Sequence, residues 1–243
     1  MKKRIFLLVV GLCGAASAAG QEVGFLTDYS LLEAQEGKWA NRIYLPANFV
    51  QRLADYDAVL VDQPEIFIAD DSKYKGAKGD QLKLLADTAR LATVERLEAG
   101  GFTVADEPGP DVLYLRWAIV DLYLKKKKRG LLSYTPVGFV VHSTKQAAIR
   151  DLWKKIDIVE LGMELEISDT VTGEVIGAAT TRQQGKRKSK GQKAELVSWQ
   201  ELDAMFSTVG ERIRCNLSNA KRPESEWEIC RDIVIEPEVA EES

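Results

Sequence analysis

Apolar and polar residues alternate along residues 159–168 more regularly than elsewhere in the chain. The apolar positions are Val159, Leu161, Met163, Leu165 and Ile167, and the positions between them include Glu160, Glu164, Glu166 and Ser168. Asp169, Thr172 and Gly173 then interrupt the alternation. A period of two that is broken by turn residues is typical of a half-buried β-hairpin, which we predict for Val159–Thr181. We expect the rest of the protein to pack on this hairpin.

Two further strands are predicted upstream of the hairpin. Tyr56–Ile68 has the composition of a strand, and Pro64 favours an edge position or a bulge because proline cannot donate a ladder hydrogen bond. Val112–Leu124 is apolar on both faces, so it is expected at the centre of the sheet. Arg116 and Asp121 lie within this strand. We expect them to pair with each other or with another local residue, because burying an unpaired charge is costly.

Two segments have the spacing of amphipathic helices. Asp80–Ala99 ends at a pair of glycines, and a brief strand at Phe102–Ala105 follows it. Ser198–Leu217 is the better defined helix, because Ser198 with Glu201 forms a capping box and Val197 with Leu202 a hydrophobic staple. A weaker helix is predicted from Thr135 to Trp153, where a threonine cap precedes a proline.

These elements predict an α+β fold. We expect a two-layer sandwich, with a mainly antiparallel sheet and the helices packed on one of its faces. The expected divisions are a signal peptide (1–18), an N-terminal arm packed on the body (19–54), the α+β domain (55–220) and a tail with an acidic, disordered end (221–243). Tyr29, Leu31, Leu32, Trp39 and Tyr44 are the predicted anchors of the arm.

The N-terminus predicts export. Lys2, Lys3 and Arg4 precede a short apolar run that is far below the ~20 residues of a membrane span, and an A-x-A site ends at Ala18. Cys13 suggests the alternative of a lipid anchor at the outer membrane, but Leu12 stands where such processing needs a small residue. We therefore expect a periplasmic mature chain that is cleaved after Ala18 and contains no transmembrane helix.

Cleavage there leaves two cysteines, Cys215 and Cys230. An even cysteine count in an exported chain predicts a disulfide, and closing this loop would contribute ~3 kcal/mol by chain entropy. The spacing is too wide for a CxxC redox pair, so a structural role is predicted.

The sequence lacks the motifs of common catalytic sites. It has no GxSxG, HExxH, GxGxxG or phosphate-binding GxxxxGK[ST] pattern, and its single histidine is His142. The segment from Asp169 to Glu174 lacks the alternating acidic ligands of a calcium loop and is expected to be a turn. We therefore predict no metal site, no cofactor and no enzymatic activity.

Basic residues form the one candidate binding surface. Antiparallel pairing of 112–124 with the first hairpin strand would bring thirteen cations together at one end of the sheet. They are Lys125, Lys126, Lys127, Lys128, Arg129, Lys154, Lys155, Arg182, Lys186, Arg187, Lys188, Lys190 and Lys193. The mature chain holds 30 basic against 37 acidic residues, so this end would stand out as a candidate site for anionic lipid surfaces. Two solubilising loops are the alternative, and nucleic acid is not expected as a partner because no aromatics are interleaved.

Four stretches together resemble a known bacterial family. They are GFLTDYSLL (24–32), YDAVLVDQPEIF (56–67), EPGPDVLYLRWAI (107–119) and ELEISDTVTGEVIGAA (164–179). In this order they are similar to the family known as domain of unknown function 3313. The resemblance implies an envelope protein of Gram-negative bacteria, often a lipoprotein, without an assigned activity or functional residues to transfer.

The functional prediction is a non-enzymatic, periplasmic protein with a binding or accessory role. Its partner would be another envelope protein or an anionic lipid surface, contacted through the basic loops. Two alternatives remain: a hydrolase with an unrecognised carboxylate site, and a structural subunit of an envelope assembly. A buried pair of acids in a deep pocket would favour the first, and an exposed apolar patch would favour the second.

Overall fold

The predicted hairpin is present as strands β7 (Ile156–Asp169) and β8 (Val175–Gln184), paired antiparallel. The turn between them is held by Asp169, whose Oδ1 accepts hydrogen bonds from the backbone N of Val171 at 2.9 Å and of Thr172 at 2.6 Å. Gly173 has a φ of 71°, a conformation that glycine adopts at little cost. The prediction of a turn at this position is confirmed.

The computed structural model describes residues 22–34, 42–72, 77–126, 156–184, 197 and 199–236. Besides the hairpin, the strands are β1 (Glu33–Ala34), β2 (Arg42–Tyr44), β3 (Ala58–Val61), β4 (Glu65–Ile68), β5 (Thr103–Ala105) and β6 (Val112–Lys126). The α-helices are α1 (Phe49–Leu53), α2 (Gly79–Ala99) and α4 (Trp199–Ala220), and short 3-10 turns are η1 (Tyr29–Leu31), η3 (Glu224–Glu226) and η4 (Cys230–Asp232). The α+β class is confirmed.

The eight strands form one sheet in the order β1-β2-β8-β7-β6-β3-β5, and β4 also pairs with β6. Strand β6 is central, as predicted, and pairs antiparallel with β7 from Leu113 to Lys126. Among the described strands the pairing is mainly antiparallel, as predicted, but the sheet is mixed. Strands β3 and β4 run parallel to β6, and β3 runs parallel to β5. The parallel pairs arise because α2 lies between β4 and the later strands and carries the chain back along the sheet. The strands before and after α2 can therefore run in the same direction.

The single strand predicted for Tyr56–Ile68 is two strands. Residues 62–64 separate β3 from β4, and Pro64 lies at this break, which is where a residue without a backbone donor disturbs the sheet least. The N-terminal arm also contains more regular structure than its sequence pattern indicates. Its β2 pairs with β8 and thereby extends the sheet beyond the hairpin.

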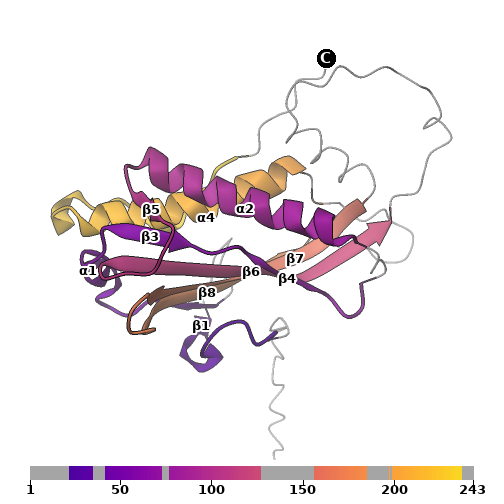
Figure 1. The fold of residues 1–243 in the computed structure, drawn as a ribbon, viewed down its shortest axis with the longest axis horizontal. Helices are drawn as coiled ribbons and strands as arrows, with labels where there is room; N and C mark the ends of the chain where they lie inside the picture. The colour runs from indigo at the N-terminus through magenta and orange to yellow at the C-terminus, as the bar shows by residue number, and fades with distance from the viewer. Residues whose placement is uncertain are drawn as a thin grey trace, which may run out of the picture.

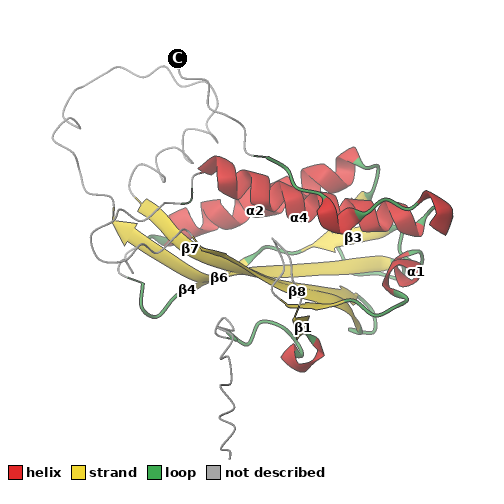
Figure 2. Cartoon of the chain, turned by 180° about the vertical axis from the view of Figure 1, so that it is seen from behind, coloured by secondary structure: helices red, strands yellow, loops and turns green. Residues whose placement is uncertain are grey.

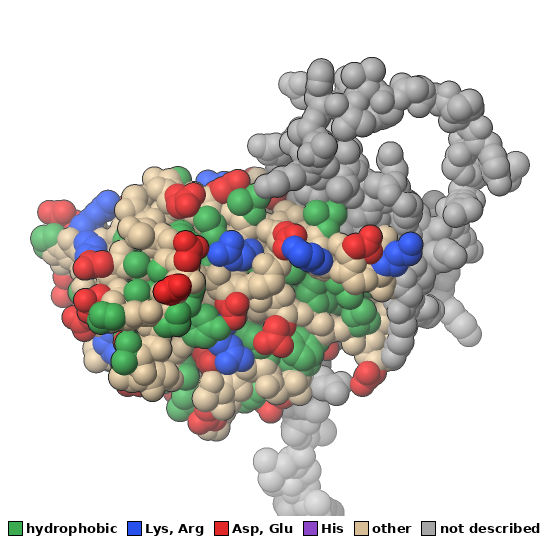
Figure 3. Space-filling model, in the orientation of Figure 1, with side chains coloured by type: hydrophobic (Ala, Val, Ile, Leu, Met, Phe, Trp, Pro, Cys, Tyr) green, Lys and Arg blue, Asp and Glu red, His purple; other side chains and the backbone are tan. Residues whose placement is uncertain are grey.

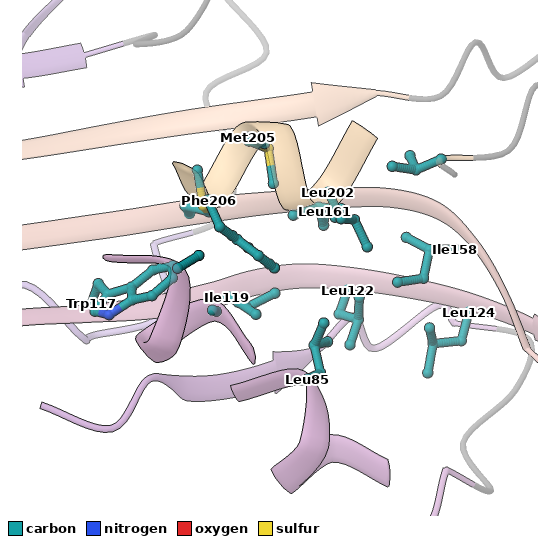
Figure 4. Close-up of a cluster of buried hydrophobic side chains, with 14 residues drawn as sticks. Leu85, Trp117, Ile119, Leu122, Leu124, Ile158, Leu161, Leu202, Met205 and Phe206 are labelled. Atoms are coloured by element: carbon teal, nitrogen blue, oxygen red, sulfur yellow. The ribbon is translucent and has the colours of Figure 1, made fainter. Parts of the chain in front are cut away.

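Helices α2 and α4 lie side by side on one side of the sheet (Figures 1 and 2). Trp117 of β6 meets Phe206 of α4 in the largest buried cluster, with ring centroids 5.6 Å apart and the planes at 73°. Figure 4 shows the aliphatic side chains of β6, β7, α2 and α4 filling the space around this pair. Edge-to-face aromatic pairs are favoured by the ring quadrupoles, so this contact fixes α4 against the central strand.

The opposite side of the sheet carries residues from the N-terminal arm (Figure 2). Phe25, Leu26 and Leu32 are buried there against Ala118 and Val120 of β6. Of the predicted anchors, Tyr29 and Tyr44 pack against this cluster, Leu31 is exposed and Trp39 lies outside the described residues.

Several other predictions also concern residues outside the described part. They are the helix from Thr135 to Trp153, the N-terminal segment 1–18, the Ser198 cap and the acidic end after Glu236. Val197 and Leu202, the predicted staple pair, are both buried in the main cluster. Among the helices of the described residues, none has the length and apolar character of a membrane span.

Candidate functional site

A cleft opens on the helix side of the sheet, where β8 and β2 extend beyond α4. One row of cross-strand partners forms its floor, because paired residues point to the same face of a sheet. This row passes from Trp117 in β6 through Leu165 and Ala179 to Ile43 in β2. The β8 residues that line the cleft have small side chains, so the floor of the cleft is recessed next to α4.

The walls of the cleft come from three separate segments. Helix α4 contributes Val209 and Ile213, α1 contributes Phe49, and the C-terminal tail contributes Trp227 and Ile229. The volume of the cleft is about 630 Å³. Small-molecule sites typically have volumes of about 300–1,000 Å³ and a mainly apolar lining, so this cleft has the size and character of a ligand site.

The tail wall is fastened to α4 by a disulfide. Cys215 and Cys230 are bonded with their Cα atoms 5.6 Å apart, which confirms the predicted staple. Next to it, the Asn219 side chain donates to the carbonyl oxygen of Glu228 and accepts from its backbone N, each at 2.9 Å. Further along the tail, Oγ1 of Thr208 accepts from the backbone N of Ile235 at 2.9 Å. The disulfide therefore stabilises one wall of the cleft.

Arg212 is the charged group of α4 that lines the cleft. Its Nε donates to the carbonyl oxygen of Ile233 at 3.0 Å. Among the described residues, no carboxylate lies within ion-pair distance of this guanidinium, and its terminal nitrogens have no hydrogen-bond acceptor. Burial lowers the pKa of Arg212, and the charge of Asp232 partly opposes this shift. The cleft therefore combines an apolar lining with one incompletely paired cation.

Two other polar groups adjoin the same space. The amide nitrogen of Asn216 donates to the carbonyl oxygen of Arg212 at 2.7 Å, and Asn216 lines the cleft. At the inner end, Nε1 of Trp117 is buried and has no hydrogen-bond partner within the described part of the chain. A buried donor without an acceptor lowers the stability of the fold by about 1–3 kcal/mol. Such groups are uncommon in folded proteins.

Gly177, Ala178 and Ala179 of β8 are small enough for another element to pack closely on the strand. The long helix α4 is not that element. Instead, a Cβ at Gly177 would lie 2.9 Å from the Phe49 ring and 3.3 Å from Leu45. The short α1 thus covers one end of β8, and α4 approaches α2 rather than β8.

Two glutamates of β7, Glu164 and Glu166, contact the N-terminal arm on the other face of the sheet. Glu166 accepts from the backbone N of Thr27 at 2.7 Å and from its Oγ1 at 2.9 Å. Arg116 forms an ion pair with Glu166 at 3.6 Å, and its guanidinium stacks 4.3 Å from the centroid of Phe25. The partner of Arg116 is therefore Glu166 and not Asp121.

Tyr29 holds the neighbouring carboxylate, Glu164. Its hydroxyl donates to Oε2 of Glu164 at 2.6 Å and accepts from the backbone N of Gly24 and of Phe25, both at 3.1 Å. The pKa of Glu164 is raised, mainly because the carboxyl group is buried. The hydrogen bond from Tyr29 lowers this pKa and so partly opposes the effect of burial. These two glutamates of β7 fasten the arm.

The predicted basic surface can be located only in part. The strand ends converge as expected, because Lys126 pairs with Ile156 and Gln184 pairs with Glu160. Lys125, Lys126 and Arg182 are described as strand backbone, and the other predicted cations lie outside the described residues. On the face that carries α2, acidic and basic side chains are interspersed (Figure 3).

No group of three or more histidine, cysteine or acidic side chains that could hold a metal ion occurs among the described residues. The cleft itself was missed at the sequence level, although one signal for it exists. Val209 and Ile213 are apolar positions of the predicted amphipathic helix, and Arg212 and Asn216 are adjacent to them on the same side of the helix. Polar residues at the border of an apolar stripe indicate an edge that is not fully covered.

Comparison with solved structures yields distant likenesses. The PelC dodecamer from Paraburkholderia phytofirmans is 15% identical with a TM-score of 0.33, and the match covers 67% of this chain and 88% of PelC. The putative neuraminyllactose-binding hemagglutinin homolog from Helicobacter pylori is 12% identical with a TM-score of 0.29, covering 70% of this chain and 84% of that one. At such low TM-scores neither likeness says anything about ligand or assembly.

No curated protein sequence matches the chain. A family model does match, over residues 21–213, and this range includes every strand of the sheet and α4 as far as Ile213. The protein therefore belongs to the DUF3313 family, described as "protein of unknown function".

Proposed function

We propose that this protein is a non-catalytic binding protein of the bacterial cell envelope and that the cleft beside α4 is its binding site. The observation that carries the proposal is the cleft of about 630 Å³, with its mainly apolar lining and few polar groups. A concave apolar site with a small number of placed polar groups is the usual form of a site for a small apolar or amphiphilic ligand.

The exposure of large apolar side chains supports the same assignment. Leu45 is 48% exposed and Ile229 is 66% exposed, and both line the cleft. Scattered apolar residues are normal at protein surfaces, but apolar residues that adjoin an open apolar cleft leave a continuous patch for a ligand to cover.

The polar groups of the cleft favour binding over catalysis. Arg212 and Asn216 are hydrogen-bond donors, and neither is a nucleophile or a general base. Thr208, the hydroxyl in the lining, donates to the carbonyl oxygen of Ala204 at 2.7 Å and accepts from the tail. The buried carboxylates Glu164 and Glu166 are occupied with the arm on the other face of the sheet.

The envelope location is proposed from the N-terminal segment and the disulfide. Residues 1–18 have the order of an export signal, and structural disulfides persist in oxidising compartments. The basic loops would contact an anionic lipid surface. Neutralising both loops should then abolish binding of the protein to anionic vesicles at low salt.

A structural subunit is the second candidate, because the same exposed apolar residues could be covered by another protein chain. Sedimentation of the purified protein separates the two candidates. A monomer with an accessible cleft supports the ligand site, and a constitutive oligomer whose assembly is broken by Leu45→Glu supports the subunit.

A neutral fluorescent dye, N-phenyl-1-naphthylamine, tests the ligand site directly. We expect it to bind the wild type, and we expect Ala179→Phe to weaken binding at least tenfold because the ring fills the floor of the cleft. Val171→Phe is the control, since it adds the same ring at the exposed hairpin turn. Absence of dye binding by the wild type, or equal binding by folded Ala179→Phe, would overturn the proposal.

A further inference from the structure

We propose that the ligand of the cleft is a single-chain lipid with an anionic head group, and that Arg212 binds the head group. The inference rests on the cleft being a binding site, as proposed above. It specifies the chemistry of the ligand from the charge, shape and lining of the cleft.

The charge of the cleft points to an anion. Arg212 uses one of its donors on Ile233, while its terminal nitrogens have no acceptor among the described residues. A guanidinium presents paired donors that match a carboxylate or a phosphate, so an anionic head group would complete its hydrogen bonding. The arginine is half-buried, where such a charge-assisted contact is stronger than in open water.

The other charged side chains of the cleft do not neutralise this guanidinium. Glu228 also lines the cleft, but its carboxylate is paired with Arg222 at 3.0 Å. Arg231, a second cation of the lining, lies 3.8 Å from Asp232. Glu164, the other acid of the lining, accepts from Tyr29 on the opposite face of the sheet. Of the two cations that line the cleft, Arg212 is therefore the one without an ion-pair partner among the described residues.

The shape of the cleft points to a chain rather than a compact ring. Its floor follows one row of residues across four strands, from Trp117 to Ile43. At ~4.8 Å between neighbouring strands, this row is about 14 Å long. The row carries the small side chain of Ala179 between the larger Leu165 and Ile43, and an extended acyl chain could lie along its length.

Burial of the acyl chain should make the affinity depend on chain length. Each methylene group removed from water contributes enough for about a three- to fourfold gain in affinity. Affinity for saturated fatty acids should therefore rise by about this factor per methylene until the cleft is filled, and then level off.

Displacement of the neutral dye tests the proposal with two lipids that share one chain, palmitate and monopalmitoylglycerol, each below its aggregation concentration. The wild type should bind palmitate at least tenfold more tightly than the uncharged glyceride. Arg212→Gln should remove this difference by weakening palmitate alone, and Arg212→Lys should restore part of it.

The matched control is Arg90→Gln. Arg90 makes the same type of contact, from its Nε to the carbonyl oxygen of Val61 at 2.9 Å, but it does not line the cleft. Its replacement should change the affinity for neither lipid. Equal loss of both lipids in Arg212→Gln would show that Arg212 only supports the tail wall, and would overturn the head-group assignment.

The remaining outcomes separate the two proposals. Dye binding without displacement by either lipid would overturn the lipid proposal and leave the binding site intact. Glyceride binding as tight as palmitate binding in the wild type would overturn the role of charge. If the dye itself does not bind, the proposed function fails and the lipid proposal fails with it.

Discussion

Gly210 of α4 lies directly against Thr93 of α2. A Cβ added to Gly210 would be 2.9 Å from the Cα of Thr93 and 3.2 Å from the Cβ of Arg96, so the two helices touch through backbone at this point. Such a contact has no flexible side chain that could give way. It sets the distance between α2 and α4, and therefore the position of the α4 wall of the cleft.

Gly210→Ala should destabilise the protein by about 1–3 kcal/mol, as overpacking of a tight contact usually does. The reason is steric, because alanine otherwise stabilises a helix relative to glycine. The measurement is the free energy of unfolding in urea. Gly79→Ala is the matched control: Gly79 also lies in a helix, but a Cβ added there would have no neighbour within 4 Å, so this change should be neutral or stabilising. Equal effects of the two changes would contradict the close approach.

Glu166→Gln should loosen the N-terminal arm. The carboxylate accepts two hydrogen bonds from Thr27 and pairs with Arg116, and the amide can satisfy neither the charge nor all of these donors. A loss of about 2 kcal/mol is expected, since hydrogen bonds to a buried charge contribute more than neutral ones. Limited proteolysis near residues 22–34 should show earlier cleavage of the variant.

Glu174→Gln is the comparison for this prediction. Glu174 pairs with Arg52 at 2.8 Å, but its side chain is 63% exposed. Exposed ion pairs contribute little, so unfolding and proteolysis should be nearly unchanged. If the two glutamine variants behave alike, burial of the Glu166 pair does not hold the arm.

The burial of Glu164 predicts a dependence of stability on pH. Burial raises the folded-state pKa of Glu164 above its unfolded value. The stability that this group contributes is therefore fully present below the unfolded pKa and is lost as the pH rises through the folded pKa. Glu164→Gln keeps an acceptor for Tyr29 without the cost of a buried charge. The variant should be more stable than the wild type at neutral pH, and the difference should shrink in acid.

Denaturant unfolding of both proteins across the acidic range checks this expectation. Taking the difference between them removes the titration of all other carboxylates that the two proteins share. A wild type that gains stability over the variant as the pH rises would show that the pKa of Glu164 is lowered instead.

The elements that could be predicted from the sequence are those defined by local periodicity. The hairpin of β7 and β8 follows from strict alternation, and α2 and α4 follow from helical spacing with clear ends. The disulfide follows from the cysteine count in a chain with an export signal. For the hairpin and the helices the local pattern contains the information, whereas the disulfide follows because only two cysteines remain in the mature chain.

The cleft depends on contacts between distant segments, which no local pattern encodes. Gly177 and Ala179 are small, and small residues on a strand are equally compatible with a helix packed closely on them or with an open floor. In the structure both residues line the cleft, and the ring of Phe49 from α1 lies against Gly177. The parallel pairing of β3 and β4 with β6 likewise depends on the path of the chain through α2.

The disulfide between Cys215 and Cys230 links stability to the shape of the cleft. Reduction should lower the free energy of unfolding by about 3 kcal/mol, because the bond closes a loop of 15 residues. It should also weaken dye binding, since Trp227 and Ile229 of the tail wall are released together with Cys230. Both cysteines are buried, so the double change to alanine is preferable to serine, which would bury unpaired hydroxyls.

Asn219→Ala distinguishes the two effects of the disulfide. This variant keeps the covalent bond but loses both hydrogen bonds to Glu228. The tail should therefore remain attached to α4, while the part of it that forms the wall of the cleft becomes more mobile. We expect a smaller loss of stability, about 1–2 kcal/mol, with a measurable loss of dye affinity. If reduction abolishes dye binding and Asn219→Ala leaves it unchanged, covalent attachment alone shapes the wall. If reduction leaves dye binding intact, the tail is not a wall of the binding site, and the site consists of the sheet, α1 and α4.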